Sequence, residues 1–233
     1  MPTDSKALTS FYRRHLPHWQ VEGATYFVTY LVKGALPTSI AQLFRNEVEA
    51  MARERDAAFD RQEHFVQVYT RAFLRLETYL AAARDADVMR LADKSAQSVI
   101  LDSLLWFDKR AELRLIAASV MGHHVHIVFD QLTTTLPTVM RRHKNFTALT
   151  INRQQGRIGE TLWHAESFDH MPRTTATVLE KATYTLLNPV KANLVSEIAA
   201  YEGNWWNPEL LVVEDNCVSW APGADLPPGL ADL

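Results

Sequence analysis

The stretch LRLIAASVMGHHVHIVF, residues 113–129, holds two apolar runs on either side of a short break. Residues 113–120 and 124–129 are rich in apolar and β-branched side chains, a composition that favours strands. Gly122 lies between the two runs and is a turn-forming residue. The stretch therefore predicts a β-hairpin, and the fold can be worked out from this hairpin toward both ends of the chain.

The segments around the hairpin alternate between strand and helix patterns. Residues 25–32 (TYFVTYLV) predict a strand, and a short strand is expected near residues 161–163. Apolar residues at helical spacing predict helices over residues 39–83 (two helices), 96–107, 135–152 and 175–188. We expect Thr133 or Thr134 to cap the third of these stretches, and Pro189 to end the last. This order predicts an α+β sandwich, an antiparallel sheet with helices packed on one face.

Length and composition place the chain among ordinary globular proteins. It has 233 residues, of which 47% are hydrophobic and 22% are charged, a length that suits one domain, or one domain with a large insertion. No apolar run approaches a membrane span and no apolar signal core occurs in residues 1–10, so we expect a cytoplasmic protein. Cys217 is the single cysteine, so any metal must be held by nitrogen and oxygen ligands.

The net charge of −3 hides a change of sign along the chain. Residues 135–192 contain eight Lys or Arg and four acidic residues, whereas after Lys191 there are seven acidic residues and no Lys or Arg. A basic segment before an acidic tail is consistent with a surface that binds a polyanion. Two solvated surfaces of opposite sign would give the same pattern, so charge alone leaves both interpretations open.

The motif GHHVHI, residues 122–127, is the first candidate for chemistry. Residues two apart in a strand project from the same face, so His124 and His126 would present two imidazoles side by side. Two nitrogen ligands leave several coordination positions open, which suits a divalent ion that also holds a phosphate oxygen and water. His123 faces the other way. Exposed histidines beside a turn are the alternative interpretation.

The segment YTLLNPVK, residues 184–191, is the second candidate. Tyr184 and Asn188 are four residues apart and would share one face of a helix, where a hydroxyl and an amide oxygen could converge on one ion. A phenol is mostly protonated at neutral pH, so Tyr184 would need a nearby cation to act as a nucleophile. A core tyrosine beside a capping asparagine is the alternative.

Four segments in this order and spacing resemble the HUH single-tyrosine transposases, and more narrowly the REP-associated tyrosine transposases. They are residues 120–129 (VMGHHVHIVF), 142–153 (RHKNFTALTINR), 162–170 (LWHAESFDH) and 184–195 (YTLLNPVKANLV). The similarity covers about residues 10–33 and 97–206. Long members of the family carry a helical insertion after the first strand, which corresponds here to about residues 37–95.

The resemblance implies a ferredoxin-like sheet in a domain spanning residues 10–206, followed by an acidic C-terminal tail, residues 207–233. It implies a metal-dependent endonuclease and strand transferase that cuts single-stranded DNA beside a hairpin through a 5′-phosphotyrosine, in DNA transposition. Tyr184 would be the nucleophile, with His124, His126 and Asn188 as ligands of Mg²⁺ or Mn²⁺.

The expected partner is single-stranded DNA with repetitive palindromic hairpins, in a bacterial cytoplasm at the nucleoid, and the protein would be a monomer or a homodimer. The residues expected to contact DNA through phosphates or base stacking are Arg141, Arg142, Lys144, Arg153, Trp163, Arg173 and Lys191.

Two other functions fit the same residues. A domesticated, catalytically inactive protein that binds DNA hairpins would keep the fold and the basic surface. A metal hydrolase of small phosphoesters would use only the histidine pair, which leaves the 184–195 segment without a role. The chain departs from the family pattern at Gly122, His123, His164, His170 and Asn193.

Overall fold

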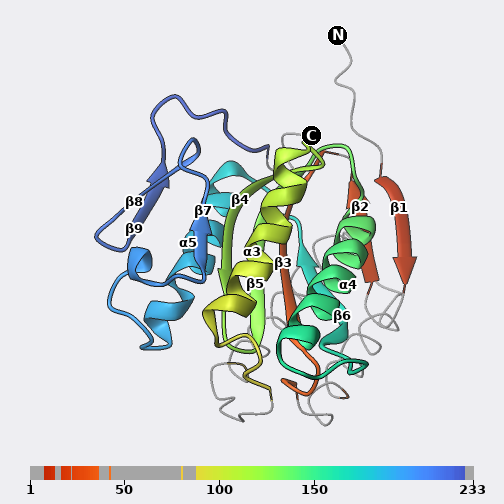
Figure 1. Cartoon of the computed structure of the whole chain (residues 1–233). Coiled ribbons are helices and arrows are strands. Elements are labelled where there is room, and N and C mark those ends of the chain that lie inside the picture. The colour runs from red at the N-terminus through yellow and green to blue at the C-terminus, as the bar shows by residue number, and fades with distance from the viewer. Residues whose placement is uncertain are drawn as a thin grey trace.

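The computed structural model describes residues 8–13, 17–21, 23–36, 42, 80 and 88–228 (Figure 1). Its main feature is an antiparallel sheet with the strand order β6-β3-β5-β4-β7. These strands are β3 (Thr25–Val32), β4 (Leu113–Val120), β5 (His124–Gln131), β6 (Trp163–His170) and β7 (Asn204–Trp206). A separate two-stranded sheet pairs β1 (Leu8–Arg13) with β2 (Pro17–Val21).

The central part of the chain follows the order β3-α3-β4-β5-α4-β6, with α3 at Lys94–Lys109 and α4 at Leu136–Gln154. β5 lies between β3 and β4, and β6 pairs with the other edge of β3. This βαββαβ order is that of a ferredoxin-like unit. The α+β class and the antiparallel sheet predicted from the sequence are confirmed, and α3 and α4 pack side by side on one face of the sheet (Figure 1).

The predicted hairpin forms the middle of the sheet, as β4 and β5. Strand alternation puts Val125 and Ile127 in the core beneath α3 and α4, so His124 and His126 project from the opposite face. β5 has a paired strand on each side and is buried along its whole length. The histidines are therefore core residues, and the alternative of exposed histidines beside a turn is excluded.

The start of α4 differs from the prediction. Its N-cap position is Thr135, whose side chain makes no capping hydrogen bond. Thr133 and Thr134 lie before the helix, and their hydroxyls donate elsewhere, to the carbonyl of Ala111 and to the carboxylate of Glu112.

A third helix, α5 (Thr175–Lys191), packs on the face of the sheet opposite to α3 and α4 (Figure 1). Its buried residues Val178, Ala182 and Leu186 recur at helical spacing and pack on a second core that includes Phe27 and Val128. The sequence predicted that the helices pack on one face of the sheet. This is correct for α3 and α4 of the ferredoxin-like unit and wrong for α5, which covers the other apolar face.

The predicted end of α5 at residue 188 is also wrong, because the helix continues through Pro189 to Lys191. Proline lacks one helical donor and disfavours a helical residue before it, but its position in the last turn limits the loss to one bond near the end. Pro189 is buried, and the Leu194 amide donates to its carbonyl at 2.9 Å. Packing and this C-terminal bond offset the local preference.

The short strand expected near residues 161–163 is longer and lies further along the chain, as the edge strand β6. It pairs with β3 with an irregular register between Tyr30 and Val32. The predicted helical insertion at about residues 37–95 lies mostly outside the described residues.

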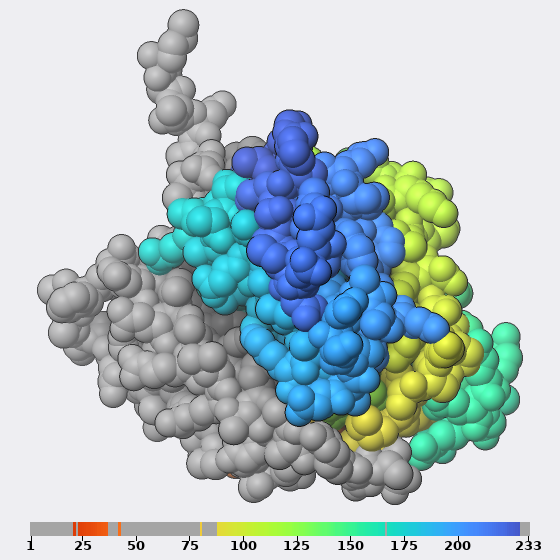
Figure 2. Space-filling model, turned by 90° about the vertical axis from the view of Figure 1, so that its left-hand side faces the viewer, coloured from red at the N-terminus to blue at the C-terminus, as the bar shows by residue number. Residues whose placement is uncertain are grey.

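The C-terminal residues fold onto the domain. After η1 (Ile198–Ala200), a hairpin of β8 (Leu211–Glu214) and β9 (Cys217–Trp220) packs on α5. Figure 2 shows the C-terminal residues, in dark blue, at the surface of the molecule that faces the viewer. Beyond the hairpin, the Arg114 guanidinium donates to the Asp225 carboxylate at 2.8 Å and the Thr25 hydroxyl to the Pro228 carbonyl at 2.9 Å. No described helix is long and apolar enough to cross a membrane.

Candidate active site

Three rings from three elements meet between the sheet and α5. The His126 ring of β5 stacks on the Phe27 ring of β3, with 5.8 Å between centroids and 16° between planes. The Tyr184 ring of α5 stands edge-on to both, 5.6 Å from His126 and 6.0 Å from Phe27. Tertiary packing thus places the candidate nucleophile against one of the candidate metal ligands.

The two histidines of β5 lie beside each other with 4.7 Å between ring centroids, and both are almost fully buried. The Nδ1 atom of each ring has a partner: His126 Nδ1 is 2.7 Å from Thr29 Oγ1, and His124 Nδ1 is 3.3 Å from His123 Nδ1. The Nε2 atom of His124 is buried and has no hydrogen-bond partner among the described residues. A buried imidazole nitrogen without a partner is unusual and is a natural ligand for a metal ion.

The environment of the pair keeps both rings neutral. Burial lowers the pKa of His126 to about 3, with a further contribution from His123, and burial with the neighbouring histidines lowers the pKa of His124 well below its usual value. A neutral imidazole is the form that binds a metal. Two neutral imidazole nitrogens, each with a partner at Nδ1, fit a divalent ion and leave room for oxygen ligands, which decide the identity of the ion.

Asn188 is one helical turn after Tyr184, as predicted. Its amide nitrogen donates to the Tyr184 carbonyl at 2.9 Å, which leaves Oδ1 as the atom able to bind a cation. In the described part of the chain, no group of three or more His, Cys, Asp or Glu side chains could hold a metal. An amide oxygen, a phosphate oxygen or water could complete the coordination beside the histidine pair.

Two of the predicted DNA-binding residues lie on this side of the sheet. Lys191 Nζ is 4.9 Å from the centre of the Tyr184 ring. Arg173 precedes α5, and its Nε is buried without a hydrogen-bond partner in the described structure. Burial, together with the charges of Lys181 and Arg173, lowers the pKa of His170 to about 4, so both cations lie near that ring.

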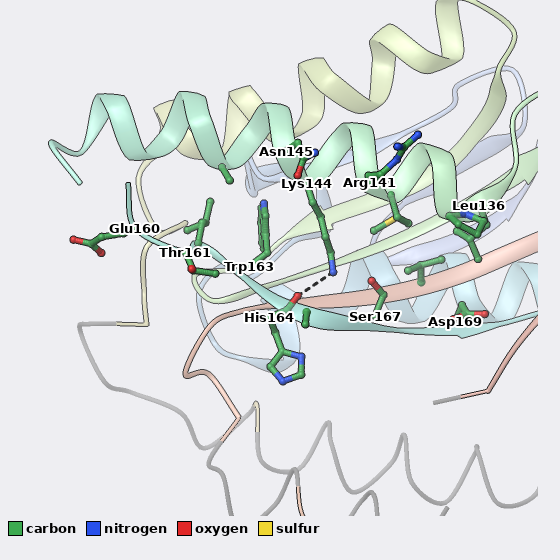
Figure 3. Close-up of a pocket in the computed structure, with 16 residues that line it drawn as sticks. Leu136, Arg141, Lys144, Asn145, Glu160, Thr161, Trp163, His164, Ser167 and Asp169 are labelled. Carbon is green, nitrogen blue, oxygen red and sulfur yellow. Dashed lines mark hydrogen bonds between the residues drawn. The ribbon is translucent and has the colours of Figure 1, made fainter. Parts of the chain in front are cut away.

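The other predicted DNA-binding residues lie on the opposite face of the sheet. Arg141, Lys144 and Trp163 line a cavity of about 310 Å³ between α4 and β6 (Figure 3). Lys144 reaches across it and donates to the His164 carbonyl at 3.2 Å. Arg142 pairs with Glu112 beside Trp106, and Arg153 is exposed near the end of α4. The structure therefore divides the predicted DNA-binding residues between two faces.

Trp163 is a core residue. Only 6% of it is exposed, its Nε1 donates to Thr147 Oγ1 at 3.0 Å, and its ring packs against Tyr30. A base cannot stack on a ring that is packed in this way, so stacking by Trp163 is not supported by this structure. Trp205, Trp206 and Trp220 also pack against the hydrophobic cores.

Comparison with known proteins leaves the family open. No protein-family model matches the chain, and no curated protein matches it. Among solved structures, a REP-associated tyrosine transposase bound to a REP hairpin aligns with a TM-score of 0.45 and 14% identity, over 84% of this chain and 82% of that chain.

Sequence patterns did not single out Thr29, Phe27 or Lys181. Thr29 and Phe27 belong to a strand whose composition indicates only burial, and their contacts with His126 depend on the pairing of β3 with β5. Lys181 could have been found, because it precedes Tyr184 by three residues in a predicted helix and so shares its face.

Proposed function

We propose that the protein is a metal-dependent single-strand DNA endonuclease and strand transferase that acts beside DNA hairpins, with Tyr184 as its nucleophile. The contact between the Tyr184 and His126 rings carries this proposal, because it joins the candidate nucleophile to the candidate metal site. The choice of hairpin DNA as substrate rests on the resemblance of residues 184–195 to the tyrosine transposases.

In the proposed reaction, Tyr184 Oη attacks the scissile phosphorus while the bond from phosphorus to the 3′-oxygen breaks. The phenolic proton is lost, and the leaving 3′-oxygen is protonated to a free 3′-hydroxyl. The downstream strand stays attached to Tyr184 through its 5′-phosphate. Attack by another 3′-hydroxyl reverses these steps and rejoins DNA, because the phosphodiester energy is retained in the tyrosine ester.

The metal, Mg²⁺ or Mn²⁺, would neutralise charge on the non-bridging oxygens of the phosphate. His124 and His126 would hold it through Nε2, and Asn188 would offer Oδ1. The Thr29 hydroxyl fixes the His126 ring, and Phe27 packs on the ring face, so His126 is oriented before any ligand binds. Lys191 and Arg173 would hold phosphates of the bound strand.

The test is incubation of labelled hairpin DNA from the flanks of the gene with the full chain, with and without Mg²⁺ or Mn²⁺, on a denaturing gel. We expect a metal-dependent protein–DNA adduct with the wild type and none with Tyr184→Phe, which should still bind DNA. Tyr201→Phe is a matched control, since the Tyr201 hydroxyl bonds the Val120 carbonyl and the Gln97 amide rather than a histidine, and it should keep the adduct.

Continued cleavage by Tyr184→Phe would remove Tyr184 from the role of nucleophile. A wild type that binds the hairpin under native conditions but never forms an adduct would refute the enzyme and leave the domesticated, catalytically inactive binding protein.

A further inference from the structure

Four polar side chains share one stripe of α5. Lys181, Tyr184, Asn188 and Lys191 are spaced by three, four and three residues, so they follow one another along the same side of the helix. Tyr184 is the nucleophile proposed above, and the two lysines lie on either side of it along the helix axis.

Both lysines reach over the rings of the candidate active site. Lys191 Nζ is 4.9 Å from the centre of the Tyr184 ring, and Lys181 Nζ is 6.0 Å from the centre of the Phe27 ring. Phe27 contacts both His126 and Tyr184, so the two positive charges border the same aromatic cluster. Neither lysine is a core residue, since Lys191 is exposed and the Lys181 side chain is 22% exposed.

Within α5 itself, little negative charge opposes these cations. Glu180 is the single acidic residue of α5, and its carboxylate, 66% exposed, pairs with Lys181 at 3.1 Å. An exposed ion pair of this kind contributes little, so a phosphate can replace the carboxylate. Lys191 forms no ion pair with the described residues, and Arg173 at the start of the helix has none either.

The spacing fits a polynucleotide backbone. Lys181 and Lys191 are ten residues apart, and at about 1.5 Å per residue their Cα atoms are roughly 15 Å apart. Phosphates follow one another at about 3.4 Å along each strand of a duplex, and an extended single strand is longer per nucleotide. The two lysines therefore span a few nucleotides, with Tyr184 between them.

We propose that α5 is the track along which the single strand runs, with Lys181 and Lys191 binding the phosphates on opposite sides of the one that Tyr184 attacks. This inference rests on the proposed function and adds to it the path of the strand and a role for Lys181. The lysines act as point charges on the backbone, so the track holds single-stranded nucleic acid without reading its sequence.

The experiment measures binding alone. Tyr184→Phe protein in buffer without divalent metal is titrated into a fluorescent oligothymidylate, and anisotropy gives the binding constant at several NaCl concentrations. Each phosphate contact on a single strand contributes about 0.7 to the slope of log K against log salt. We expect Lys181→Gln and Lys191→Gln each to lower the slope by about 0.7, the double variant by about twice that, and Lys181→Arg to restore it.

Lys109→Gln is the matched control, because Lys109 is an exposed lysine in the last turn of α3, on the other face of the sheet. Its slope should equal that of the parent. The proposed track would be wrong if both α5 variants kept the slope of the parent, or if Lys109→Gln lowered the slope as much as they do.

The two proposals fail separately. An adduct in the wild type together with unchanged slopes removes the track and leaves the enzyme. Lowered slopes in a protein whose wild type forms no adduct show that the two lysines bind the single strand along α5 and remove the enzyme.

Discussion

Thr29 shows how a single hydroxyl can fix the candidate metal site. It lies 2.7 Å from His126 Nδ1 and so fixes the ring with Nε2 as the nitrogen for a metal. Groups that orient a ligating histidine typically change metal affinity by about 10- to 100-fold when they are removed. We therefore expect Thr29→Val, which keeps the shape of the side chain, to weaken Mn²⁺ binding by a factor in that range in isothermal titration calorimetry.

Thr150→Val makes the same chemical change on α4, where the hydroxyl bonds only the Phe146 carbonyl. Mn²⁺ affinity should not change in this control. Equal affinities for wild type and Thr29→Val would mean that His126 is not a ligand whose orientation matters.

At the scale of the element, α5 is stabilised at its N-terminal end. At its start a capping box joins Thr174 and Thr177: the Thr177 amide donates to Thr174 Oγ1 at 3.2 Å, and the Thr174 amide donates to Thr177 Oγ1 at 2.9 Å. Loss of such a cap costs about 0.5–2 kcal/mol. Thr174→Ala should lower the free energy of unfolding by this amount in urea titrations.

The matched control is Thr135→Ala at the N-cap of α4, where the side chain makes no capping hydrogen bond. The free energy of unfolding should fall less there than in Thr174→Ala. The reverse order would show that the box at the start of α5 contributes nothing to stability.

At the scale of the whole molecule, the His143 side chain of α4 forms hydrogen bonds to both β3 and α3. Its Nε2 is 2.6 Å from the Tyr30 hydroxyl of β3 and its Nδ1 is 2.9 Å from Ser103 Oγ of α3, while its own backbone belongs to α4. Burial, with a smaller effect from the charge of Lys144, lowers the pKa of His143 to about 3. The folded protein therefore keeps this ring neutral at a pH where the unfolded chain would protonate it.

The pH dependence of stability follows from this difference. The unfolded chain binds a proton at His143 below its ordinary pKa of about 6.5, and the folded chain does not until about pH 3, so stability is present above that range and falls as the pH drops through it. One such histidine contributes a slope of up to about 1.4 kcal/mol per pH unit. Urea titrations at several pH values across this range give the free energy of unfolding as a function of pH. This free energy should change less steeply with pH for His143→Gln than for wild type, and parallel curves would contradict the assignment.

The sequence by itself determined the features that follow from the period of a single strand or helix. Strand alternation put His124 and His126 on one face of β5, and helical spacing put Tyr184 and Asn188 on one side of α5. The strand at residues 25–32, the hairpin and the α+β class followed from the same patterns. These features depend on the geometry of a few consecutive residues, which is the same in any fold that contains the element.

Only the tertiary structure decided what these elements meet. It buried the histidine pair in a central strand, carried α5 through Pro189 on the face opposite to α3 and α4, brought Tyr184 against His126, and divided the basic residues between two faces. Local periodicity gives the direction of a side chain relative to its own element and not the element that packs on it. Strand order and helix placement depend on burying apolar surface from distant parts of the chain, which no short window of sequence contains.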